Sequence, residues 1–215
     1  MRAAVLTAAV VASATLSSAC GGTGGAPAAR PTWSATAGGS GPDSPSAAVG
    51  QAGAGRAPRP IARSTPVRLV IPSIGVDTAL MSLGLASDGT VQVPPIEANA
   101  PAGWYRGSPT PGQTGPSVIL AHVTVGRYGD GVFLHLSRLG PGDRATVRLQ
   151  DGASAVFAVD RVQTVAKAQF PTQAVYGNVD RPELRLITCG GPRNPTGGGY
   201  LDNVVVYAHL VSTAG

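Results

Sequence analysis

Short runs of apolar and β-branched residues, each ended by a glycine or proline turn, follow one another from Pro66 to residue 211. Runs of this kind at close spacing are typical of an all-β barrel or sandwich. The segment 133–139 is the best candidate for a short helix. The expected strands cover 67–71, 74–80, 91–93, 117–125, 145–149, 155–165, 184–188 and 204–211.

The segment before these runs has a different composition. Residues 21–64 are rich in Gly, Ala, Pro, Ser and Thr, and they carry almost no large apolar residues apart from Trp33. A segment that cannot bury apolar surface does not fold by itself, so we interpret it as a flexible tether. The folded domain is therefore expected over residues 65–212.

The first 20 residues have the features of a bacterial export signal. Met1 and Arg2 give a positive start, and the mainly apolar stretch 3–16 is shorter than the ~20 residues of a membrane span. Ala19-Cys20 resembles the lipidation site of lipoproteins, although Ser17 stands where an aliphatic residue is usual. We expect Cys20 to carry a lipid anchor; a cleaved signal and an uncleaved anchor are the alternatives.

Each of these alternatives exports the domain, to the outer face of the cytoplasmic membrane or the cell wall. The net charge of +5 and the sequence pI of about 9.8 suit an anionic cell surface, or simply solubility. The arginines are scattered and Lys167 is the only lysine, so the basic cluster typical of a nucleic-acid interface is missing from the sequence.

Cysteine usage singles out one thiol. The chain has two cysteines, and with Cys20 in the signal segment Cys189 is left unpaired in an exported domain. Exported proteins usually pair their cysteines, so Cys189 is a candidate nucleophile, with a buried inert thiol as the alternative. It follows an apolar run and precedes two glycines, a position where a strand can present a reactive group.

A reactive thiol needs an imidazole or cationic neighbour. The chain offers His122, His135 and His209; on the sequence alone His122 is the first choice and His209 the second. One cysteine and three scattered histidines do not form a metal-ligand pattern, so no metal and no cofactor are expected.

Several segments resemble the sortase family, most closely the class F sortases of actinobacteria, and they occur in the same order along the chain. The matching segments are VRLVIPSIGVD (67–77), LGLASDGTVQVPP (83–95), AGWYRGSPTPGQTGPSVILAHV (102–123), VFLHLSRLGPGD (132–143) and LRLITCGGPRNPTGGGYLDNVVVYA (184–208).

The resemblance implies a closed sortase-type β-barrel of about eight strands with one or two short helices. It also implies a cysteine transpeptidase with His122 and Cys189 as the catalytic pair. Such an enzyme cleaves an LPXTG-like sorting signal of a surface protein through a thioacyl intermediate. It then transfers the signal to an amine acceptor in the cell wall or on another protein, without a cofactor.

The sequence departs from the family pattern where a catalytic arginine is usual. Leu201 stands at that position, in the segment YLDN. Arg193, the only arginine after Cys189, is one candidate replacement; Thr188 and Asn203 are the other candidates for binding substrate or the oxyanion.

Two further departures, Ala121 for glycine and Thr124 for aspartate, surround His122. They leave open a sortase-fold domain with weakened or lost catalysis that acts as a binding module.

Another cell-wall cysteine acyltransferase is the remaining alternative. L,D-transpeptidases carry a histidine two residues before the cysteine, where this chain has Ile187. Papain-like hydrolases place the cysteine before its histidine at a helix start, whereas here His122 precedes Cys189 and the cysteine follows an expected strand.

Overall fold

The computed structural model describes residues 58–215, so the signal segment 1–20, Cys20 and residues 21–57 of the expected tether lie outside the described residues. Within the described part, no helix has both the length and the apolar character needed to cross a membrane.

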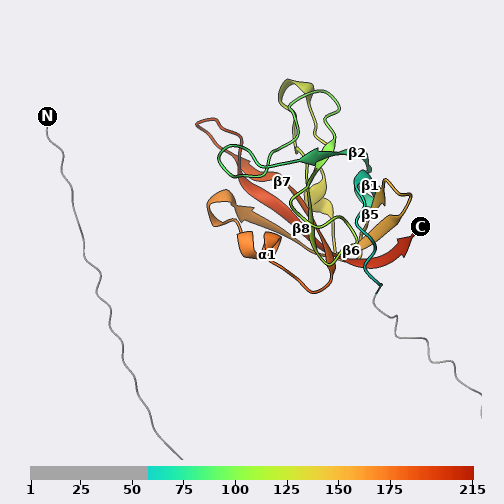
Figure 1. Cartoon of the computed structure of the whole chain (residues 1–215). Helices are drawn as coiled ribbons and strands as arrows, with labels where there is room; N and C mark the ends of the chain where they lie inside the picture. Colours follow the sequence, from blue (N-terminus) through green and yellow to red (C-terminus); the bar gives the residue numbers. More distant parts are fainter. Residues whose placement is uncertain (1–57) are drawn as a thin grey trace, which may run out of the picture. The chain divides into compact units, whose positions relative to one another are not determined.

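Eight strands close into a barrel (Figure 1). The strands are β1 (Pro66–Ile71), β2 (Val76–Leu83), β3 (Ala102–Tyr105), β4 (Gly115–Leu120), β5 (Arg144–Leu149), β6 (Ser154–Ala166), β7 (Pro182–Arg193) and β8 (Tyr200–Ala214). Their order around the barrel is β1-β2-β3-β4-β7-β8-β6-β5. The β2–β3 and β4–β7 pairs are parallel and the others antiparallel. The expected closed barrel of about eight strands is confirmed.

The helical content is small. Within residues 58–215, one α-helix, α1 (Thr172–Tyr176), lies between β6 and β7. The same part of the chain has four 3-10 helices: η1 (Pro72–Ile74), η2 (Gly126–Tyr128), η3 (Leu136–Arg138) and η4 (Lys167–Gln169). The expected helix over 133–139 is only the 3-10 turn η3. Phe133 and Leu136 are both fully buried, and residues three apart lie one above the other in a 3-10 turn.

Two of the expected strands differ from the structure, and one observed strand was not expected. Residues 91–93 form only an isolated bridge, between Leu85 and Val91, and the run 117–125 leaves the sheet after Leu120. Strand β3 was not anticipated because its sequence, Ala-Gly-Trp-Tyr, begins with two residues of low β-propensity.

Both faces of the β4–β7–β8 sheet are buried, which explains why these strands are nearly continuous apolar runs. An inner cluster inside the barrel includes Ile119, Ala121, Leu186 and Val204. An outer cluster on the opposite face includes Val118, Val175, Ile187, Val205 and Tyr207. Val175 belongs to α1, so the segment between β6 and β7 covers the outer face.

The chain enters the barrel along a short extended segment. The backbone N–H of Ile61 donates to the carbonyl of Gly112 (3.0 Å), and the Ile61 side chain is partly buried against the inner cluster. The N–H of Gln150 donates to Thr65 O (2.8 Å). Gly112 lies just before β4, so the entry segment packs at the end of the barrel where β4 begins.

Candidate active site

Strands β4 and β7 run parallel and end side by side. Leu120 of β4 is the register partner of Ile187 of β7. His122 follows Leu120 by two residues, and Cys189 follows Ile187 by two residues. The register of β4 and β7 therefore brings His122 and Cys189 next to each other. The N–H of Ala121 donates to Ile187 O at 3.2 Å, so the two segments stay hydrogen-bonded one residue beyond the end of β4.

The alternation of side chains places Cys189 on the outer face. Ile187 and Val205 belong to the outer cluster, and Cys189 and Asn203 each lie two residues from one of them. Ala121 belongs to the inner cluster, so His122 follows on the outer side. Cys189 and Asn203 are direct register partners. The three polar residues therefore share one face, with Cys189 between His122 and Asn203.

Thr188 points the other way. Its side chain is 5% exposed, and its hydroxyl donates to the carbonyl of Ala121 (2.7 Å). This hydrogen bond joins β7 to the residue that follows β4, so Thr188 helps to hold β4 and β7 in register.

The Cys189 thiol is free and half-buried, and the backbone after it demands glycine. A Cβ on Gly190 would lie 2.6 Å from Val204, and one on Gly191, whose φ is +70°, would lie 2.0 Å from Asp202. A cavity of about 360 Å³ opens here, lined by Cys189 and both glycines together with residues of 123–137 and of β6 and β8. Cys189, which is partly exposed, thus lies at the rim of a hollow that Thr188 also lines.

His122 is held from two sides. Its carbonyl accepts a hydrogen bond from the N–H of Phe133 (3.0 Å), and its Nε2 lies 2.7 Å from the carbonyl oxygen of Pro94. The other histidines are placed differently. His209 bonds Asp160 (2.6 Å) and is the register partner of Glu183, near the start of β7, whereas Cys189 lies near its end; His135 sits at the start of η3.

The structure does not bring Arg193 to the thiol. Its guanidinium donates to the Tyr200 hydroxyl (3.1 Å) and lies 4.8 Å from that ring's centroid, beyond a register shift that separates it from Gly190. Leu201 is 43% exposed. Ala166, the last residue of β6, pairs with Asp202, so Lys167 at the start of η4 comes beside the start of β8. Asn203 is the donor with direct register to Cys189.

An apolar cavity of about 470 Å³ lies on the same outer face. Its lining combines Leu85 and Val91 from the β2–β3 loop, Tyr105 of β3, and Phe170 and Tyr176 from the segment around α1. The two tyrosine rings meet edge to face with centroids 6.4 Å apart. The thiol and this apolar surface together suit a peptide that lies across the outer face.

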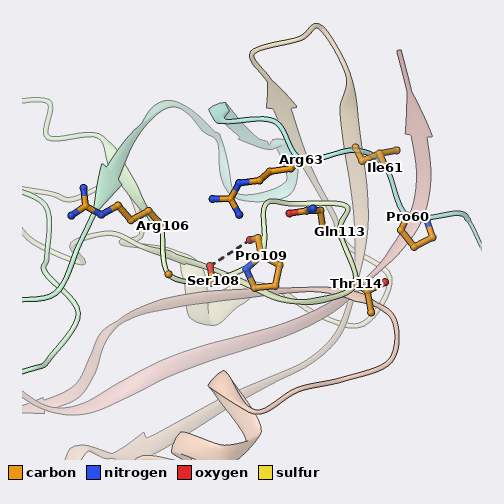
Figure 2. Close-up of a pocket in the computed structure, with 9 residues that line it drawn as sticks. Pro60, Ile61, Arg63, Arg106, Ser108, Pro109, Gln113 and Thr114 are labelled. Atoms are coloured by element: carbon orange, nitrogen blue, oxygen red, sulfur yellow. Dashed lines mark hydrogen bonds between the residues drawn. The ribbon is translucent and has the colours of Figure 1, made fainter.

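A larger cavity of about 520 Å³ has no part in this site. Figure 2 shows its lining, with Arg63 from the entry segment and Arg106 from the β3–β4 loop. Neither Cys189 nor His122 lines it. In the described residues no group of three or more His, Cys, Asp or Glu side chains is arranged to hold a metal ion.

Gly131 packs against the backbone of His122, and this contact gives a sharp prediction. A Cβ on Gly131 would lie 2.2 Å from His122 O and 3.0 Å from His122 Cβ, so Gly131→Ala must displace the histidine. We expect peptide turnover to fall by about 10-fold or more, because misplacement by about 1 Å is costly in catalysis. Gly140→Ala is the matched control, since nothing lies within 4 Å of its added Cβ.

Turnover and thermal unfolding would be measured for both variants. Equal turnover of the Gly131→Ala and Gly140→Ala proteins would show that the position of His122 tolerates the shift.

The family model for the sortase domain matches residues 69–211. The chain belongs to the sortase family. No curated protein sequence matches the chain.

Solved sortases show the same fold. A lid mutant of sortase A from Corynebacterium diphtheriae has a TM-score of 0.51 and 20% identity, over 70% of this chain and 72% of that one. Sortase A from Listeria monocytogenes has a TM-score of 0.51 and 16% identity, covering 71% and 90%. A pilus-related sortase C of Group B Streptococcus has a TM-score of 0.50 and 17% identity, covering 70% and 69%.

In this sortase, the hydrogen bond between His122 and Pro94 was not predicted from the sequence. The two residues are 28 positions apart, and the hydrogen-bonding atom of Pro94 belongs to the backbone. The two consecutive prolines were the only local signal, because they fix an extended backbone.

Proposed function

We propose that this sortase is an exported cysteine transpeptidase of class F, anchored to the membrane by a lipid on Cys20. It cleaves an LPXTG-like sorting signal of a surface protein at the outer face of the cytoplasmic membrane. It then transfers the signal to an amine acceptor in the cell wall or on another protein. The family and the solved sortases support a transpeptidase. The observation that carries the proposal is that His122, Cys189 and Asn203 lie in a row on the outer face of the sheet, each partly buried.

The chemistry follows from this row. The Cys189 thiolate attacks the carbonyl carbon of the scissile peptide bond, and the carbonyl oxygen becomes an oxyanion. His122, as imidazolium, gives its proton to the leaving amine when the C–N bond breaks, and a thioacyl enzyme remains. An incoming amine attacks the thioester and His122 takes its proton. The new amide leaves and the thiolate is restored.

Asn203 is the oxyanion donor that we propose in place of the usual arginine. Its amide is a neutral donor on the strand next to Cys189, whereas Arg193 is engaged with Tyr200. Loss of one oxyanion donor costs about 10²- to 10³-fold in kcat, and we expect that loss in Asn203→Ala. Arg193→Ala should change kcat much less; a larger loss in Arg193→Ala than in Asn203→Ala would contradict this assignment.

The experiment that tests the function supplies the full chain with a library of LPXTG-like peptides and hydroxylamine. Hydroxylamine attacks the thioester in place of the natural amine and releases a peptide hydroxamate with the free thiol. Mass spectrometry then identifies which sequences are cleaved and after which residue. Products that depend on Cys189 establish the transpeptidase.

A sortase-fold binding module is the alternative, suggested by Leu201 at the usual arginine position. It would give no hydroxamate from any peptide, and its Cys189 would resist alkylation while the protein still bound a sorting-signal peptide.

A further inference from the structure

The ring of His122 is fixed by a loop far away in the sequence. Pro94 lies in the 84–101 connection between β2 and β3, and its carbonyl oxygen is 2.7 Å from His122 Nε2. Within residues 58–215 this is the ring's one hydrogen bond, and no acid bonds the imidazole there. The carbonyl therefore occupies the place of the third group that orients a catalytic base.

The first half of the loop is closed on itself. The N–H of Gly84 donates to the side-chain oxygen of Gln92 (2.8 Å), and the N–H of Gln92 donates to Gly84 O (3.0 Å). Leu85 and Val91 form a bridge inside this closed turn. Val93 and the two prolines follow directly, so their starting point is fixed relative to β2.

The two prolines restrict the backbone that carries the acceptor. The pyrrolidine rings fix φ at Pro94 and Pro95, and a residue before proline is driven to an extended conformation. Further along, the N–H of Ala100 donates to Glu97 O (3.3 Å) and Ala100 is buried. The backbone is thus restrained on both sides of Pro94. The Pro94 carbonyl therefore cannot shift far if the ring of His122 moves.

The chemistry of this contact decides which nitrogen of His122 carries hydrogen. A carbonyl oxygen only accepts, so Nε2 must be the donor. In the neutral imidazole the hydrogen then sits on Nε2 and the lone pair on Nδ1. A 180° turn of the ring would place a carbon against the oxygen and lose the bond.

We infer that the Pro94 carbonyl holds His122 in the Nε2–H tautomer, so that Nδ1 is the nitrogen that exchanges protons with the leaving and incoming amines. The inference rests on the proposed transpeptidase for the role of the proton. The tautomer itself is a property of the resting protein. Pro94 is a positioning residue, because it acts on the reaction through His122.

The test is the nitrogen NMR spectrum of the full chain labelled with 15N-histidine. Three histidines are present, and His122→Gln identifies the signals of His122. At a pH where the ring is neutral, we expect Nε2 to have the shift of a protonated nitrogen and Nδ1 that of an unprotonated one. The opposite pattern, or fast exchange between both tautomers, would overturn the inference.

The double substitution Pro94→Gly and Pro95→Gly removes the restraint on the carbonyl and keeps the acceptor atom. Both tautomers should then appear, and kcat should fall by about 10- to 100-fold, the usual cost of losing an orienting partner, with KM within about twofold. Pro94→Ala, which keeps Pro95 and so the extended backbone, should restore most of kcat. Pro141→Gly, in the exposed turn before β5, controls for loss of a proline elsewhere.

An unchanged tautomer and kcat in the double glycine variant would refute the role of Pro94. If that variant does not fold, the wild-type spectrum still decides the tautomer. If the wild type processes no peptide, the proposed function fails, while the nitrogen shifts still test the contact.

Discussion

The Cys189→Ala protein should form no hydroxamate, with turnover at least about 10³-fold below that of the wild type, because loss of the nucleophile removes the covalent route. The sulfur has no substitute nearby: Thr188 uses its hydroxyl on Ala121, and Asn203 has no nucleophilic atom. The measurement is the peptide and hydroxylamine reaction followed by mass spectrometry. Thermal unfolding should change little, since the thiol is half-buried and makes no hydrogen bond in the described structure.

The second cysteine provides a matched control. Cys20→Ser should keep full turnover and leave Cys189 as the single site of alkylation. In His122→Ala, turnover should fall by about 10²- to 10⁴-fold, the range for a general acid and base. His209→Ala should keep turnover, because His209 lies on β8 beside the start of β7, away from Cys189. Persistent cleavage by Cys189→Ala would show that another group performs the chemistry.

Glu183→Ala should be among the most destabilising single changes in the barrel, at about 3–5 kcal/mol of unfolding free energy. Glu183 accepts hydrogen bonds from Arg181 (2.7 Å) and from the buried Arg185, which is 3% exposed. Arg185 also lies 4.7 Å from the Tyr207 ring centroid. Without the carboxylate, a buried guanidinium keeps its charge and retains only carbonyl acceptors, those of Ala174 and Leu184.

Chemical denaturation would measure this loss. Asp77→Ala is the matched control, because the Arg68–Asp77 pair is exposed and its removal should leave the midpoint nearly unchanged. If the denaturation midpoint of Glu183→Ala were as close to that of the wild type as the midpoint of Asp77→Ala is, water would be shown to reach Arg185.

The same carboxylate makes stability depend on pH. Burial alone raises the pKa of Glu183, and the hydrogen bonds from Arg181 and Arg185 outweigh it, so the folded-state pKa lies below the ordinary 4.5. A depressed carboxyl pKa stabilises the folded state fully above the ordinary value. This stabilisation is lost as the pH falls through the folded-state pKa. The difference in stability between wild type and Glu183→Gln should therefore shrink in acid.

Much of the barrel could be predicted from its sequence because most strands bury at least one face. The alternation in 145–149 and the apolar runs in 184–188 and 204–211 correspond to β5, β7 and β8. β3 and α1 were missed for a physical reason: each is only four or five residues long. Segments of that length are stabilised by tertiary contacts, such as the burial of Trp104 and Val175, more than by local propensity.

The candidate site could be predicted from the sequence where a residue type itself suggests a chemical role. An unpaired cysteine after an apolar run indicates a nucleophile, and the family resemblance adds His122. Asn203 needed the β7–β8 register to be placed opposite Cys189. The hydrogen bond between His122 and Pro94 could not be predicted from the sequence, because its acceptor is a backbone carbonyl, which every residue has.

The two ends of the barrel differ in what they carry. β4 and β7 both run toward the end that carries His122 and Cys189, while Ile61 enters beside Gly112 and Ala155 at the end where β4 begins. Thr213, near the end of β8, pairs with Ala155, so the entry segment and the C-terminal strand end lie on that same side (Figure 1). The thiol and the entry segment therefore lie at opposite ends of the barrel. For an enzyme anchored through the segment that precedes residue 58, as proposed, a peptide can reach the thiol at the end of the barrel opposite to the one where the chain enters.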